Sequence, residues 1–272
     1  GGFLHIVNHA LFKSLLFFTA GSIYQQTHTR NIEQLGGLIK KMPVTAVFFL
    51  LGYVAISGLP PFNGFISEFL IYVGLFKELH TGDLSLSLVL LGGIVGLVLI
   101  GGLALYCFTK VFSIVFLGNP RTVKTEHATD VEVSMLFPKY IIGIFILLIG
   151  ILPVLVLKPL AGAVSVFTPD VTPLIEIAPS VQGISVSLAV FILIIAALWL
   201  IRKMATKNKI TETGPTWGCA YTGAKPAVHQ YTSTSYADYI SNLAKYVTGN
   251  KKHFKPVEKD ELFPGPRTFE SH

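Results

Sequence analysis

Six long apolar stretches constrain this chain more than any other feature of its sequence. Interrupted only by scattered charges, they cover residues 3–25, 43–59, 62–79, 86–117, 138–157 and 181–201. A helix of about 20 apolar residues crosses the hydrocarbon core of a bilayer. Charged residues make up 13% of the chain, against about 25% in soluble domains. The sequence therefore predicts an all-α, polytopic transmembrane helical bundle.

The third stretch opens on a run that a regular helix cannot contain. From Gly58 to Gly64 the sequence reads GLPPFNG, with two prolines and two glycines inside apolar sequence. Proline removes a backbone donor and clashes with the preceding turn. Broken backbone at membrane depth is tolerated only where protein or a water-filled cavity satisfies the freed polar groups. We therefore expect a break in the regular helical backbone here, marked by Pro60, Pro61 and Gly64.

Polar and basic segments between the stretches indicate the topology. Residues 26–42 carry apolar side chains at helical spacing, so we expect a short amphipathic helix along the membrane surface. A basic cluster follows the last stretch, with Arg202, Lys203, Lys207 and Lys209. The positive-inside rule places this cluster, and the polar tail after it, in the cytoplasm. Counting each stretch as one span puts residues 118–137 in the cytoplasm and residues 26–42 outside, although the latter carry three basic residues.

Three ionisable side chains in the first stretch fall on one helical face. His5, His9 and Lys13 are spaced i, i+4 and i+8, which stacks them along a helix. An ionisable group inside a span costs at least about 2.5 kcal/mol, so we expect Lys13 to have a function. A polar group at the membrane surface is the alternative for His5. Zinc sites have three or four ligands, so the histidine pair is too small to predict one.

Two further ionisable residues interrupt apolar sequence. Glu68 follows the proline run, where water and free backbone groups would allow it to gain and lose a proton. A solvated cap at the start of a helix is the alternative for this carboxylate. Lys110 lies near the end of the fourth stretch, where snorkelling to the interface and a function in proton movement fit equally well.

Composition argues against several other classes of protein. The formal net charge of +6 fits Lys and Arg at the ends of spans, not nucleic-acid binding. Cys107 and Cys219 form no C-x-x-C pair, and an iron–sulfur cluster needs about four thiolates. We therefore expect no cofactor in this chain. Because the sequence opens on Gly1 without a methionine, we expect it to start inside a longer protein.

The residues from His5 to Phe17 carry a motif that resembles a known family. They read HIVNHALFKSLLF, similar to the H-x-x-x-H-A-x-F-K-[AS]-x-L-F motif of antiporter-like proton-translocating subunits. These subunits occur in respiratory complex I, in multi-subunit sodium/proton antiporters, and in energy-converting hydrogenases and formate hydrogenlyase. Residues 35–43 and 57–65 resemble the family's next segment and its discontinuous helix. Residues 215–221 and 230–232 resemble the hydrogenase and formate hydrogenlyase branch.

The resemblance implies a larger fold of two inverted repeats, each with a broken helix. Residues 1–160 would form the C-terminal part of its proton-translocating domain, residues 161–202 a loop with an additional span, and residues 203–272 a cytoplasmic tail. The family's path would include His5, His9 and Lys13, with Glu68 as the ionisable residue of the broken helix. From its position in the sequence, Lys110 is our further candidate for the same path. Many relatives place a lysine there, so the choice between proton and sodium stays open.

The leading hypothesis is a proton-translocating subunit of a hydrogenase-like, formate hydrogenlyase-like or NADH:quinone oxidoreductase-like complex in the cell membrane. Electrons would move in other membrane and peripheral subunits, which with the lipid bilayer are the expected partners. Lys13 and Glu68 would alternate in protonation, with His5 and His9 as relays. One alternative is a subunit of an Mrp-type cation/proton antiporter. The other is a membrane-embedded metalloenzyme built on the two histidines.

Overall fold

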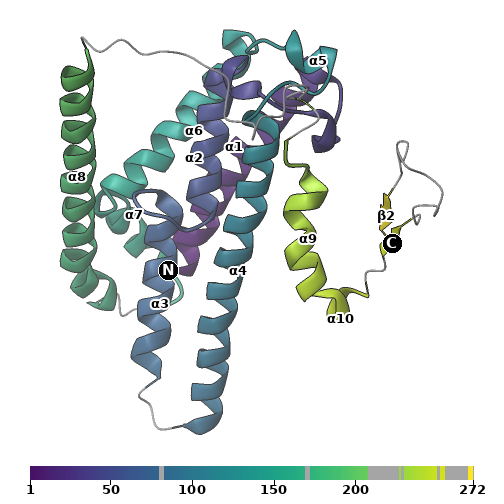
Figure 1. Ribbon diagram of the computed structural model, residues 1–272. Coiled ribbons are helices and arrows are strands. Elements are labelled where there is room, and N and C mark those ends of the chain that lie inside the picture. The colour runs from purple at the N-terminus through teal and green to yellow at the C-terminus, as the bar shows by residue number, and fades with distance from the viewer. Residues whose placement is uncertain are drawn as a thin grey trace.

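The chain folds as a bundle of long helices with a small C-terminal extension (Figure 1). The computed structural model describes residues 1–79, 83–168, 172–207, 227, 230–249, 252–254 and 269–271. The helices are α1 (Gly2–Thr27), α2 (Pro43–Ile56), α3 (Asn63–Glu78), α4 (Leu84–Phe116), α5 (Val123–Glu126), α6 (Val133–Ile151), α7 (Val154–Val164), α8 (Thr172–Thr206), α9 (Ser233–Leu243) and α10 (Lys245–Thr248). Two short strands, β1 (Lys252–Phe254) and β2 (Phe269–Ser271), pair antiparallel.

Two short helices together make one crossing. α2 and α3 have 14 and 16 residues, so they are about 21 and 24 Å long and neither spans a core of about 30 Å. Figure 1 shows them end to end beside α4, with the interruption between them. Within the described part of the chain, four other helices are long and apolar enough to cross a membrane, namely α1, α4, α6 and Glu176–Thr206 of α8. The predicted polytopic bundle with a discontinuous helix is confirmed.

The discontinuous span corrects the topology expected from the sequence. Counting residues 43–59, 62–79 and 86–117 as three separate spans placed residues 26–42 and 118–137 on opposite sides, and this is wrong. The N–H of Gly37 donates to the carbonyl oxygen of Leu117 at 2.9 Å, and the Arg121 guanidinium donates to the carbonyl oxygen of Leu35. The loops 28–42 and 117–132 therefore lie at the same end of the bundle, and the conflict with the positive-inside rule disappears.

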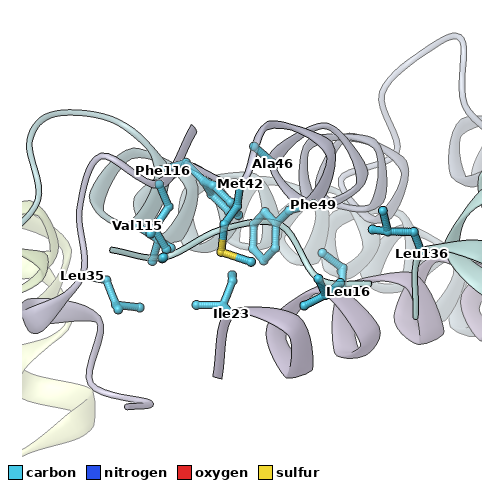
Figure 2. Close-up of a cluster of buried hydrophobic side chains, with 12 residues drawn as sticks. Leu16, Ile23, Leu35, Met42, Ala46, Phe49, Val115, Phe116 and Leu136 are labelled. Carbon is cyan, nitrogen blue, oxygen red and sulfur yellow. The ribbon is translucent and has the colours of Figure 1, made fainter. Parts of the chain in front are cut away.

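The predicted amphipathic helix within residues 26–42 is also wrong. The segment contains two 3₁₀ turns, Ile32–Gln34 and Leu38–Lys40, with a glycine pair between them. Gly37 has a φ of +68°, a conformation that ends a regular helix and favours glycine. The leucines of this segment are buried in a cluster beneath the loop, and Figure 2 labels Leu16, Ile23, Leu35, Met42, Ala46, Phe49, Val115, Phe116 and Leu136.

The fifth apolar stretch starts earlier than its sequence indicates. α6 begins at Val133 and holds Pro138 inside the helix, and Pro153 separates it from α7. The predicted start at Pro138 is therefore wrong by five residues. As a consequence Lys139 lies in the second turn of a spanning helix and not directly after its first residue.

Large apolar side chains are exposed along α4 and α8. Leu88 and Leu99 of α4, and Leu193 and Leu198 of α8, are each about 60% exposed or more. Soluble proteins rarely expose contiguous apolar surface on this scale, whereas hydrocarbon chains solvate it. These faces fit a membrane protein.

The C-terminal tail is attached to the same end as the two loops. Glu33 accepts hydrogen bonds from the N–H of Ser233 at 3.1 Å, and from both the N–H and the hydroxyl of Thr234 at 2.7 Å. Burial raises the pKa of the Glu33 carboxyl, but the hydrogen bonds from Thr234 and Ser233 and the charge of Arg121 outweigh it and bring the pKa below its usual value. The start of α9 is thereby fixed to the loop 28–42.

The shared end of the two loops can be tested by cysteine labelling. In a background with Cys107 and Cys219 replaced by serine, Lys40→Cys and Lys124→Cys should react with an impermeant thiol reagent in one vesicle orientation only, and in the same one. Both side chains are exposed. Ser85→Cys, at the start of α4, is the control and should react in the opposite orientation. Reaction of Lys40→Cys and Lys124→Cys from opposite faces would contradict the discontinuous span.

Candidate functional site

The backbone leaves helical geometry after Ile56 and returns to it at Asn63. Pro60 and Pro61 lie inside this interruption, and Gly64 lies one residue into α3. Gly58 has a φ of +64°, a conformation that L side chains rarely adopt. The two prolines lack backbone donors, so the carbonyl groups around them cannot continue the helical ladder.

Glycines allow the neighbouring helices to approach the break closely. A Cβ atom on Gly64 would overlap the carbonyl oxygen of Ala55, at the end of α2. A Cβ atom on Gly150 of α6 would overlap the carbonyl oxygen of Pro61. The half-helices and α6 are therefore packed backbone to backbone at the break, a contact that only the smallest residue permits.

Two buried asparagines hold α1 against the start of α3. Asn8 Nδ2 donates to the carbonyl oxygen of Asn63 at 2.7 Å, and Asn63 Nδ2 donates to Asn8 Oδ1 at 3.1 Å. Both residues are 0% exposed. Among the described residues, Asn63 Oδ1 is a buried side-chain acceptor with no hydrogen-bond donor. Leaving such an acceptor unpaired costs roughly 1–3 kcal/mol.

His5 reaches the same half-helix. Its Nδ1 lies 3.0 Å from Ser67 Oγ, and that hydroxyl also donates to the carbonyl oxygen of Gly64 at 2.9 Å. The rings of His5 and His9 have centroids 6.3 Å apart. His5 is half-buried and His9 is exposed. The structure therefore brings His5 to the broken helix, whereas His9 lies on the open face of α1.

Glu68 follows Ser67 but faces a different neighbour. Its half-buried side chain lines a pocket of about 320 Å³ between α3, α4 and the break, with Ser57, Gly58, Tyr72, Gly101 and Gly102 among the lining residues. A Cβ atom on Gly58 would lie 2.8 Å from Glu68 Cδ, so the carboxylate lies directly against the unwound backbone. α3 has no acidic residue in its first turn. The alternative of a helix cap for Glu68 is therefore wrong.

The two lysines of the predicted path stand apart from this pocket. Lys13 is half-buried on α1, and Lys110 is half-buried on α4, six residues before the helix ends at Phe116. Neither lines the Glu68 pocket. The structure thus joins His5 to α3 and places Glu68 at the break, but it shows no direct contact between Lys13 and Glu68.

Sequence reasoning missed one buried ionisable residue, Lys139 of α6. It is 1% exposed, and its Nζ donates to Ser22 Oγ of α1. A lone lysine following Pro138 in apolar sequence is the signal that could have found it. The misplaced start of the span made Lys139 look like a residue at a helix end.

The metalloenzyme alternative gains no support from this geometry. Within the described ranges, no three His, Cys, Asp or Glu side chains are grouped so that they could hold a metal ion. A zinc centre needs at least three protein ligands, and the pair of His5 and His9 supplies two.

Gly58→Ala should destabilise the break and lower the yield of folded protein. The new Cβ would sit at a positive φ and against the Glu68 carboxyl group, at a cost of about 1–3 kcal/mol. The measurement is the thermal unfolding midpoint of the detergent-purified protein. Gly96→Ala on α4, where nothing lies within 4 Å of the new Cβ, is the control. Equal midpoints for the two variants would contradict the close contact between Gly58 and Glu68.

Fold and site together define a polytopic helical membrane protein whose discontinuous span carries a carboxylate at its break. Residues 1–94 match the family described as NADH:quinone oxidoreductase/Mrp antiporter, TM. This part of the chain belongs to that family of antiporter-like membrane proteins, and the resemblance of the His5–Phe17 motif is confirmed.

Individual proteins match this chain over different shares of its length. The chain is 34% identical to formate hydrogenlyase subunit 3 of Escherichia coli K12 over 271 residues, which cover 97% of this chain and 42% of that protein. It is 33% identical to hydrogenase-4 component B of the same organism over 81% of this chain and 34% of that protein. It is 36% identical to a Na⁺/H⁺ antiporter subunit of Alkalihalophilus pseudofirmus over 55% of this chain and 19% of that protein. The chain thus spans less than half the length of these relatives.

Proposed function

We propose that this chain is part of the proton-translocating membrane subunit of a hydrogenase- or formate hydrogenlyase-like complex. The observation that carries the proposal is the position of Glu68, in a pocket at the interrupted backbone of a membrane-spanning helix. An ionisable group within a span is costly, and such groups mark ion pathways. Unwound backbone beside it offers polar groups that support water at membrane depth.

The break offers a place where a proton can be held and passed on. Asn63 Oδ1 is a buried acceptor without a protein donor among the described residues, and buried acceptors are commonly paired by an ordered water. His5 contacts Ser67, the neighbour of Glu68 in the chain. In the proposed path, Glu68 and Lys13 exchange protons through water, and His5 and His9 relay them along α1. Lys110 lies toward the loop end of α4.

The orientation of the path follows from charge. Basic residues gather at the end that holds the two loops and the last turn of α8, where Arg30, Lys40, Lys41, Arg121, Lys124, Arg202 and Lys203 lie. By the positive-inside rule this end, and the tail fixed to it by Glu33, faces the cytoplasm. The proposed division of the chain keeps the path in residues 1–160, the loop with the additional span in residues 161–202 and the tail in residues 203–272.

The relatives favour a redox-driven complex as the setting. The match to formate hydrogenlyase subunit 3 extends over 97% of the chain and so includes the tail. The match to the antiporter protein covers 55% of the chain. Partner subunits would carry the electron transfer, because the chain brings no cluster of thiolates of its own.

Proton translocation is tested in inverted membrane vesicles that contain the complete complex. With formate or hydrogen as reductant, turnover should acidify the vesicle interior, as reported by a pH-sensitive dye, and an uncoupler should abolish the signal. The same result is expected in sodium-free buffer. Turnover without proton movement would refute the proposal.

A sodium/proton antiporter is the second candidate. It is favoured by the identity to the antiporter protein and by the family match of residues 1–94, which include the discontinuous span. It predicts sodium-dependent dye signals driven by an imposed pH gradient, without any reductant. Such signals would replace the first candidate by the second.

A further inference from the structure

Lys139 is a buried ionisable group that the proposed path does not use. We propose that Lys139, with Ser22 and Asp130, forms the proton-loading site at the loop end of the bundle, where protons pass between cytoplasmic water and the interior. The inference rests on the proposed function and adds a named residue at one end of its path.

The position of Lys139 separates it from the residues at the break. It lies in the second turn of α6, whose first residue, Val133, follows the loop 117–132. Its partner Ser22 is nine residues beyond Lys13 on α1, about 14 Å along the helix axis. Lys139 is therefore nearer to the loop end than either Lys13 or the break.

Burial and pairing indicate more than a packing role. Lys139 is 1% exposed and Ser22 is 0% exposed. Among the described residues its hydrogen-bond partner is the Ser22 hydroxyl, which in turn donates to the carbonyl oxygen of Phe18 at 3.0 Å. An ammonium group has three donors, so one hydroxyl satisfies a third of them. An apolar side chain would fill this site without the cost of a buried charge.

Asp130 links this site to the aqueous surface. The carboxylate caps α2 from the adjacent loop, accepting from the N–H of Val44 at 2.9 Å and from the N–H and hydroxyl of Thr45 at 3.1 and 2.7 Å. It is half-buried, and it lies close enough to Lys139 for its charge to act on the amine. Its negative charge favours a cation at Lys139 and attracts protons from the loop side.

The proposed transfer is balanced and involves no electrons. The neutral Lys139 amine accepts a proton from a hydronium ion at the Asp130 side, which becomes water, and the amine becomes an ammonium. The ammonium then releases one proton to water on the interior side and returns to the amine. The Thr19 hydroxyl, buried one turn before Ser22 on α1, lies in the direction of the break.

The test compares Lys139→Arg and Lys139→Met in the vesicle assay, as protons moved per electron pair. Arginine keeps the positive charge and the donors but stays protonated at any physiological pH. Both variants should lower the ratio about tenfold or more, because neither can cycle a proton. Lys77→Met, at an exposed position in the last turn of α3, is the matched control and should keep the wild-type ratio.

The other outcomes each contradict a stated part of the proposal. If Lys139→Arg keeps the wild-type ratio, Lys139 is a fixed charge, and if Lys139→Met keeps it, the residue is packing. If neither variant assembles, Ser22→Ala decides, with an expected loss of about threefold in the ratio and an unchanged ratio as the contrary result. Glu68→Gln is measured alongside. If Glu68→Gln loses translocation while Lys139→Arg keeps it, the Lys139 site is refuted and the proposed function stands. A wild-type complex that moves no protons refutes the proposed function, and this inference with it.

Discussion

Replacing Glu68 by glutamine should stop proton translocation while the complex still assembles. Glutamine has nearly the same shape as glutamate and fills the same pocket beside Gly58, but its amide cannot bind and release a proton at physiological pH. Removing a positioned proton-transfer group lowers the rate by roughly 100-fold or more. Glu68→Asp should retain part of the activity, because the carboxylate remains and only its reach changes.

The measurement is the initial rate of vesicle acidification, normalised to assembled complex. Glu78→Gln, an exposed position in the last turn of α3, is the matched control and should translocate normally. Electron transfer is expected to slow together with translocation if the two are tightly coupled. If Glu68→Gln translocates at the wild-type rate, the carboxylate at the break has no role in proton movement.

Lys13→Ala should have the second-largest effect, with translocation reduced about 100-fold. Lys13 follows His5 and His9 on one face of α1, and His9 is exposed on that face. A lysine amine within a span costs free energy unless a partner side chain or water forms hydrogen bonds with it. Removing it should therefore leave assembly intact, or improve it, while breaking the relay between α1 and Glu68.

The double variant Lys13→Ala with Glu68→Gln separates a shared path from two independent ones. Residues that act in one path give non-additive effects, so the double variant should be no slower than the slower single variant. Lys77→Ala is the control for loss of one positive charge. A wild-type rate in Lys13→Ala, with Glu68→Gln inactive, would remove α1 from the path.

The break in the helical backbone could be predicted from residues alone. Two consecutive prolines followed by Gly64 inside apolar sequence leave no other local structure, and the break lies where the sequence indicates. The alignment of His5, His9 and Lys13 also follows from helical spacing. Both are local properties that depend on a few neighbouring residues.

The topology could not be predicted in the same way. Whether residues 43–59 and 62–79 make one crossing or two depends on the length of each half-helix between its ends. Those ends are set at Pro43, Ile56, Asn63 and Glu78, and each half turned out too short to cross. The burial of Leu35 and Leu38 beneath the loop depends on contacts with α4, which lie far away in the sequence.

The details of the site depend on tertiary contacts as well. The pairing of Asn8 with Asn63 joins residues 55 positions apart, and that of Lys139 with Ser22 joins residues 117 positions apart. Spacing along one helix carries no information on such pairs. The sequence likewise placed Glu68 near the break, but only the packing of α4 shows that it faces a pocket lined by Gly101 and Gly102.

The most direct test of the central claim is infrared difference spectroscopy of the complex during turnover, which observes the Glu68 proton itself. A protonated carboxyl group absorbs apart from a carboxylate, and its band shifts when H₂O is replaced by D₂O. We predict a carboxyl band that changes between the resting and turning-over states in the wild-type complex and is missing in Glu68→Gln. Identical carboxyl difference spectra for the wild type and Glu68→Gln would show that Glu68 keeps one protonation state, and would contradict its place in the path.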